Sequence, residues 1–180
     1  MNSYCGRLSV FPTKNWMAQV SAGRITQPER QAEGDVVRTT AFLHYSRPMA
    51  DGNSWSTSLN WGRNHDTETK HDRNSYLLET VYPATKKDFL TGRVEIVGKD
   101  ELFANDPALE HRLEHTAGST FQIQAYTLGY TRDIGTFWNV ETGIGGNVSA
   151  YAIPSAIKPF YGDHPWGANI YLRLWLKRDK

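Results

Sequence analysis

The last strand-like stretch of the chain, residues 168–176, alternates strictly between apolar and mixed side chains. Its even positions from 170 to 176 carry Ile or Leu, and its odd positions carry Tyr171, Arg173 and Trp175. Successive side chains of a β-strand point to opposite faces, so this stretch has one aliphatic face and one polar and aromatic face. A strand of this kind is typical of a barrel wall with lipid on one side.

The same alternation recurs along the whole chain, in segments separated by turn residues. The segments are residues 4–11, 16–25, 36–47, 54–64, 75–82, 89–97, 120–131, 137–151 and 168–176. Short turns at 12–15, 48–53, 83–88 and 132–136 alternate with long polar connections at 26–34, 65–73, 99–119 and 152–167. This order predicts an all-β fold, an antiparallel up-and-down barrel, in a single domain that spans residues 1–180.

The composition of the second face favours a transmembrane barrel over a soluble sandwich. A soluble sandwich exposes charged side chains such as Lys and Glu on the face opposite its core. Here that face carries mainly Ser, Thr, Asn, Gln and Gly, which suits a hydrated lumen, and Trp and Tyr lie near the strand ends, as in an interfacial girdle. We therefore expect a transmembrane β-barrel in a bacterial outer membrane, in contact with lipid.

Charge and cysteine content exclude several other classes of protein. The formal net charge of the 180 residues is +1, and Lys and Arg are interspersed with Asp and Glu, so we expect no nucleic-acid partner. Cys5 is the single cysteine, which rules out an intrachain disulfide. In an outer-membrane barrel the short turns are periplasmic, so the segment at 4–11 would run inward, and no signal-peptide pattern precedes it. We expect the chain to be the C-terminal portion of a longer barrel.

Several short motifs carry a resemblance to known sequences. They include Gly6-Arg7-Leu8-Ser9, Trp61-Gly62-Arg63-Asn64, Thr91-Gly92-Arg93-Val94-Glu95 and Leu128-Gly129-Tyr130-Thr131-Arg132-Asp133. On these motifs the chain resembles the C-terminal part of a family of largely uncharacterised bacterial outer-membrane β-barrel proteins of acidobacterial type. The resemblance covers nearly the whole chain. It implies a barrel in the outer membrane and transfers no catalytic residue.

Charged side chains on the predicted lumen face are the candidate functional residues. They are Arg38, Glu79, Arg93, Glu95 and Glu141. Such charges set ion selectivity in a pore, and they also pair across neighbouring strands and stiffen the wall. No motif points to catalysis, a cofactor or a metal: His111 and His115 are four residues apart, but they lie in a polar segment without the zinc-protease order, which we interpret as a solvated loop.

The preferred function is a passive, porin-like pore for small polar solutes rather than an enzyme. One alternative is a structural or surface-interaction barrel of the outer membrane with a plugged lumen, which the bulky Phe42, Tyr171 and Trp175 on the inner face favour. Another is a soluble lipid-binding β-barrel, whose interior would have to be the apolar face.

Overall fold

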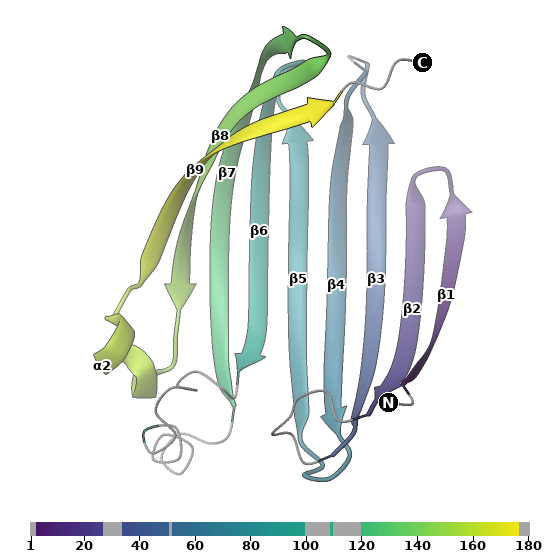
Figure 1. Cartoon of the computed structure of the whole chain (residues 1–180), viewed down its shortest axis with the longest axis vertical. Coiled ribbons are helices and arrows are strands. Elements are labelled where there is room, and N and C mark those ends of the chain that lie inside the picture. Colours follow the sequence, from purple (N-terminus) through teal and green to yellow (C-terminus); the bar gives the residue numbers. More distant parts are fainter. Residues whose placement is uncertain (1–2, 27–33, 51, 100–108, 110–119, 177–180) are drawn as a thin grey trace.

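The computed structural model describes residues 3–26, 34–50, 52–99, 109 and 120–176. Within them, nine strands pair in chain order as one antiparallel sheet, which confirms the all-β, up-and-down prediction (Figure 1). The strands are β1 (Tyr4–Thr13), β2 (Trp16–Ile25), β3 (Val36–Pro48), β4 (Ser54–Asp66), β5 (Asp72–Pro83), β6 (Asp88–Lys99), β7 (Phe121–Phe137), β8 (Val140–Ala152) and β9 (Trp166–Leu176). The sheet curves but stays open, since among the described residues β1 pairs only with β2 and β9 only with β8.

The hairpin between β7 and β8 differs from the expected one. A turn was expected at residues 132–136, but β7 continues through them to Phe137, with an irregular register between Asp133 and Gly135. The chain reverses instead at Trp138 and Asn139, whose φ angles are 45° and 65°. Two consecutive positive φ values are the signature of a two-residue turn that matches strand twist. Trp-Asn lacks the usual glycine of such turns, whereas the glycine at 135 sits in the irregular stretch, so the sequence pointed to the wrong site.

Two short helices occupy the connection between β8 and β9. They are η1 (Ser155–Ile157) and α2 (Lys158–Tyr161), and the side chain of Ile157 is buried there. Of the long connection expected at 99–119, the structure describes Lys99 and Leu109. Across the part of the chain that the structure describes, no helix is long and apolar enough to cross a membrane.

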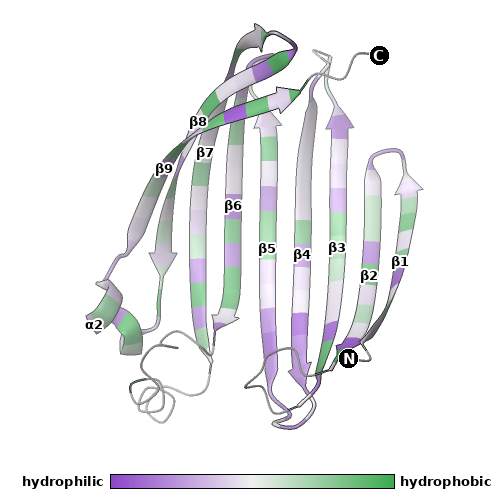
Figure 2. Ribbon diagram, viewed as in Figure 1, coloured by the Kyte–Doolittle hydropathy of each residue, from purple (hydrophilic) through white to green (hydrophobic). Residues whose placement is uncertain are grey.

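The strand register sorts side chains onto two chemically different faces. Leu43, Leu59, Leu78, Val94 and Tyr126 lie directly opposite one another across β3 to β7. Directly opposed residues of antiparallel strands share a face, so these side chains form one continuous row. Figure 2 shows the resulting change of hydropathy from residue to residue along each strand. We call the side that carries this row the apolar face.

The opposite side, which we call the polar face, is joined across strands by hydroxyl groups. The Oγ of Ser21 and the Oγ1 of Thr40 lie 2.7 Å apart, and Thr127 and Ser149 form an equivalent pair at 2.7 Å. Within the described residues, the buried large hydrophobic side chains are limited to Val36, Phe121 and Ile157. Among these residues, neither face of the sheet is therefore covered by a packed hydrophobic core.

Candidate functional site

Three of the five charged residues singled out in the sequence meet on the polar face. Glu79 of β5 lies directly opposite Arg93 of β6, and Glu95 is two residues further along β6 on the same face. The guanidinium of Arg93 donates from Nη1 to Glu79 Oε2 over 3.4 Å and from Nη2 to Glu95 Oε2 over 3.0 Å. One cation held between two carboxylates leaves a formal charge of −1, because a single guanidinium neutralises only one of them.

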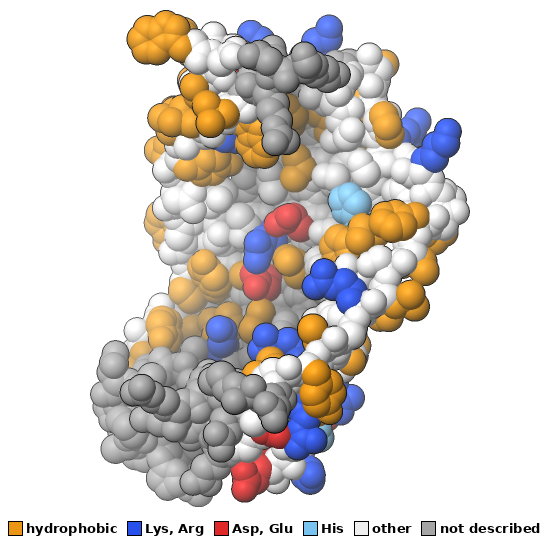
Figure 3. All heavy atoms as spheres, turned by 45° about the vertical axis from the view of Figure 1, so that its right-hand side comes forward, with side chains coloured by type: hydrophobic (Ala, Val, Ile, Leu, Met, Phe, Trp, Pro, Cys, Tyr) orange, Lys and Arg blue, Asp and Glu red, His pale blue; other side chains and the backbone are white. Residues whose placement is uncertain are grey.

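These side chains stand beside a hollow in the polar face. A depression of about 500 Å³ is lined by Gln19, Thr40, Phe42, Asn60 and Glu95, among others. Figure 3 shows acidic and basic side chains together in the hollowed centre of this side of the molecule. Phe42, Leu77 and Val97 line the depression beside the amide, hydroxyl and carboxylate groups, so it offers water and polar solutes hydrogen-bonding partners next to apolar surface.

The other two candidates lie away from these three residues. Arg38 is near the long-loop end of β3, where its Nε donates to Asn64 Oδ1 over 2.8 Å. Glu141 is the second residue of β8, beside the tight turn, and lies opposite Trp175. Arg38 and Glu141 thus flank the polar face at its two ends, while Glu79, Arg93 and Glu95 occupy its middle.

A tyrosine packed over glycine organises the polar face of the last three strands. Tyr171 of β9 lies opposite Gly145 of β8, and its hydroxyl group is 2.6 Å from Thr131 Oγ1 on β7. A Cβ atom added at Gly145 would be 2.6 Å from the Tyr171 ring, so only glycine leaves room for it. Tyr171 lies on a different strand from Gly145, so the sequence alone did not identify this pairing.

Arg173 adds a second bulky group to the same region. Its guanidinium pairs with Asp133 and lies 5.6 Å from the centroid of the Phe89 ring. Both contacts cross strands, and Asp133 belongs to the irregular stretch of β7 that the sequence assigned to a turn. The sequence did not indicate this cluster of Arg173, Asp133 and Phe89, because it placed a turn at 132–136, where β7 continues.

Aromatic side chains mark two levels on the apolar face. Trp16, Tyr45, Trp55 and Tyr82 form a chain near the short turns, with successive ring centroids 4.8, 5.6 and 6.4 Å apart; we call it the turn-end row. Trp61 and Tyr76 lie opposite each other nearer the long loops. The two levels are six residues apart on β4 and on β5, or about 20 Å along a strand.

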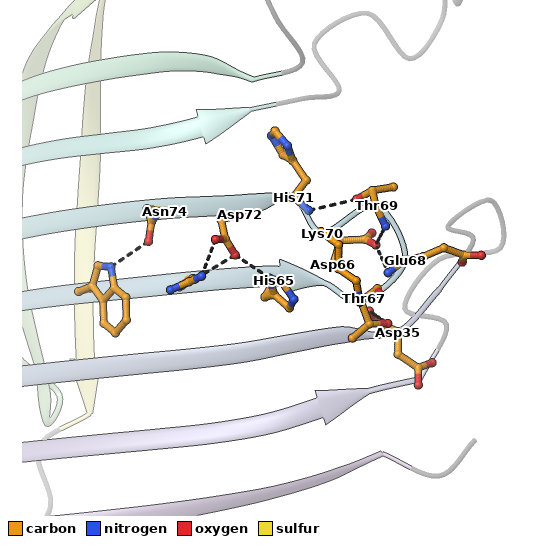
Figure 4. A network of polar contacts seen from close by, with 12 residues as sticks. Asp35, His65, Asp66, Thr67, Glu68, Thr69, Lys70, His71, Asp72 and Asn74 are labelled. Atoms are coloured by element: carbon orange, nitrogen blue, oxygen red, sulfur yellow. Dashed lines mark hydrogen bonds and ion pairs between the residues drawn. The ribbon is translucent and has the colours of Figure 1, made fainter.

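Beyond the second level, toward the long loops, a polar network begins (Figure 4). The indole N–H of Trp61 donates to Asn74 Oδ1 over 3.2 Å. The carboxylate of Asp72 accepts a hydrogen bond from Arg63 Nη2, and its Oδ1 lies 2.8 Å from Nδ1 of His65. The backbone N–H groups of Glu68 and Thr69 both donate to Asp66 Oδ1 over 2.9 Å, and these two bonds lower the pKa of the Asp66 carboxyl group.

No metal centre is evident in this part of the molecule. Over the described ranges, no three His, Cys, Asp or Glu side chains gather in a way that would hold an ion. His111 and His115, interpreted from the sequence as part of a solvated loop, fall outside those ranges. No protein-family model, curated protein or solved structure matches the chain.

Proposed function

We propose that this chain is part of the wall of a bacterial outer-membrane β-barrel that acts as a passive pore for small polar solutes, without catalytic activity. The observation that carries the proposal is the division of the sheet into an apolar and a polar face. Lipid would contact the apolar face, and water and solute would contact the polar face.

The apolar face has the composition that lipid requires. At its described positions between the two aromatic levels, strand after strand carries aliphatic, glycine, threonine or aromatic side chains and no charged one. Leu59 and Leu78 remain 49% and 46% exposed. A soluble monomer rarely exposes an apolar surface of this extent, whereas an apolar band about 25 Å tall between aromatic girdles is characteristic of outer-membrane barrels.

The polar face supports the pore over the alternatives. The hollow lies on this face, beside Glu95 and its partner Arg93. A soluble lipid-binding barrel would need the apolar side chains inside, so its ligand cavity would lie on the apolar face and not on the polar face. Because Glu79 and Glu95 outnumber Arg93, the middle of the passage would favour cations over anions.

A plugged, structural barrel is the second candidate. The observation in its favour is the cluster of Tyr171, Arg173 and Phe89 on the polar face of the sheet. Bulky side chains locked by hydrogen bonds and ring contacts narrow the space on that side. In this case the outer loops, rather than the lumen, would carry the function.

Conductance separates these two functions. The complete barrel to which this chain belongs is reconstituted into planar lipid bilayers, and the cation-to-anion permeability ratio is measured for the original protein, Arg93→Gln and Glu95→Gln. We expect a conducting pore whose cation preference rises in Arg93→Gln and falls in Glu95→Gln, because each substitution changes the charge of the passage by one unit.

Arg63→Gln is the matched control, because Arg63 lies on the apolar face beyond the second aromatic level. This substitution changes the net charge by the same amount as Arg93→Gln. It should leave the permeability ratio unchanged. Protein that inserts into the bilayer but carries no current would contradict the pore and favour the plugged barrel. An equal response to Arg63→Gln and Arg93→Gln would show that the polar face is not the ion path.

A further inference from the structure

The short-turn end of the sheet carries a group of cations that the pore does not use. Lys14, Arg47, Lys86 and Lys87 are all exposed there, and we call them the basic rim. Within the described part of the chain, none of the four forms an ion pair. Figure 3 shows basic side chains along this end of the molecule.

Hydrogen bonds between neighbouring turns hold the rim together. The turn that carries Lys14 is joined to β3 next to Arg47, because Asn15 Nδ2 donates to the carbonyl of Ser46 over 2.5 Å and the Ser46 N–H donates back to the Asn15 carbonyl over 2.8 Å. Asn53 Nδ2 donates to the carbonyl of Lys86 over 3.3 Å, which joins the next two turns. The cations therefore sit on a connected edge of the sheet and not on separate loops.

The nearest described acid at this edge is already neutralised. Asp88 accepts hydrogen bonds from the Tyr130 hydroxyl group at 2.5 Å and from Arg132 Nη1 at 2.9 Å. Arg132 and Asp88 cancel each other's charge, as do Arg173 and Asp133. Glu141 at the start of β8 offsets one of the four cations of the basic rim, so the described residues leave this edge with a net positive charge.

The turn-end row of aromatic rings lies on the apolar face at the level of Arg47 and next to the turns that carry the three lysines. Arg47 is directly opposite Trp55, and Lys14 precedes Trp16 by two residues. Trp and Tyr settle at the level of lipid headgroups, where their apolar rings contact acyl chains and their polar atoms contact water. A cation just above such a ring is at the depth of the headgroup phosphate.

We propose that the basic rim is a docking surface for the phosphate headgroups of anionic phospholipids in the leaflet that meets the short turns. This inference rests on the proposed membrane location but not on the pore. Cations near an anionic membrane surface favour partitioning by about a factor of five each, an effect that salt weakens. The rim would therefore gather anionic lipid around the barrel and fix its height in the bilayer.

Lipid selectivity tests the proposal directly. The full chain is reconstituted into phosphatidylcholine bilayers with a trace of spin-labelled phosphatidylglycerol or spin-labelled phosphatidylcholine, and electron paramagnetic resonance gives the fraction of each immobilised at the protein. We expect the anionic label to associate about fivefold more strongly than the zwitterionic one, the effect of one well-placed cation. In the variant K14Q/R47Q/K86Q/K87Q the ratio should fall close to one.

The matched control is R7Q/K70Q/K99Q/K158Q, which removes the same charge from exposed or half-buried cations elsewhere on the molecule. It should keep the preference, and raising the salt concentration should weaken the preference in the original protein. Equal immobilisation of both labels by the original protein, or an equal loss in both variants, would overturn the basic rim while leaving the membrane location intact. Protein that fails to stay with the bilayers in an alkaline wash would instead contradict the proposed function.

Discussion

Gly145 is a residue at which one added methyl group should disturb the sheet. Its Cβ would meet the Tyr171 ring at 2.6 Å, and the ring is held by its hydroxyl contact with Thr131. We expect Gly145→Ala to lower the free energy of unfolding by about 1–3 kcal/mol, the usual cost of overpacking. Urea titration in detergent micelles, followed by tryptophan fluorescence, measures it.

Gly167→Ala is the control at the residue scale, because no atom lies within 4 Å of a Cβ added there. It should leave the free energy of unfolding nearly unchanged. The cost of Gly145→Ala should also shrink in a Tyr171→Ala background, since the clash needs both side chains. If that cost is the same with and without the ring, the packing of Tyr171 over Gly145 does not stabilise the sheet.

Contacts between individual side chains were predictable from the sequence only where the pairing register of two neighbouring strands is enough to bring them together. Glu79, Arg93 and Glu95 could be placed together because they lie at matching heights of two strands joined by a short turn. Tyr171 and Thr131 are 40 residues apart and on strands that do not pair with each other. Their contact depends on the curvature of the sheet, which the pattern of side chains does not encode.

Among the elements, β4 and β5 are joined on the apolar face by the hydroxyl group of Thr80. Its Oγ1 lies 2.8 Å from Thr57 Oγ1 and accepts the indole N–H of Trp55 over 3.0 Å. The same hydroxyl group donates to the Ser56 carbonyl over 3.1 Å. We expect Thr80→Val, which keeps the shape and removes the hydroxyl group, to lower the free energy of unfolding by about 1–3 kcal/mol because it leaves three polar partners without their bond. Urea titration reports the loss.

Thr39→Val is the matched substitution for this element, because Thr39 shares the apolar face of β3 and its hydroxyl group forms no side-chain hydrogen bond among the described residues. It should be neutral or slightly stabilising, since valine suits a strand. A similar loss in both variants would mean that the Thr80 hydroxyl group contributes nothing specific to the pairing of β4 with β5.

At the scale of elements, strands were easier to predict than the turns between them. Alternation over eight or more residues identified every described strand, because a period of two is visible without knowing the partners. The β7–β8 turn was misplaced because Trp138 adopts a positive φ value, which is rare for a bulky residue. Asn139 favours such a conformation, but Asp133 and Gly135, which together resemble a turn more strongly, lie within β7.

The assignment of faces for the whole molecule predicts opposite responses at two adjacent positions. Leu59→Arg would place a charge in the middle of the apolar face, and in a bilayer such a charge costs about 2–4 kcal/mol. Ser58→Arg would point to the polar face, opposite Glu79, and should be tolerated. The free energy of unfolding in phospholipid vesicles, measured by urea titration, distinguishes the two.

A soluble sheet would respond differently to the same pair of substitutions. Leu59 is 49% exposed, so an arginine there would be harmless in water. Equal stability of Leu59→Arg and the original protein in vesicles would therefore contradict lipid contact at the apolar face. The sequence alone predicted this division into two faces. It also predicted a barrel, whereas the sheet is open over the described residues. The alternation of side chains does not encode closure, because edges pair through backbone groups that every residue shares.

The strand count has a consequence for those edges. Over the described residues the number of antiparallel strands is odd, so β1 and β9 point in the same direction. A ring in which neighbours always oppose one another needs an even number, and β1 brought against β9 would make a single parallel seam. A single strand that formed antiparallel hydrogen bonds with both edges would have to run in the direction opposite to β1 and β9. Parity thus restricts what can complete the sheet before any side chain is considered.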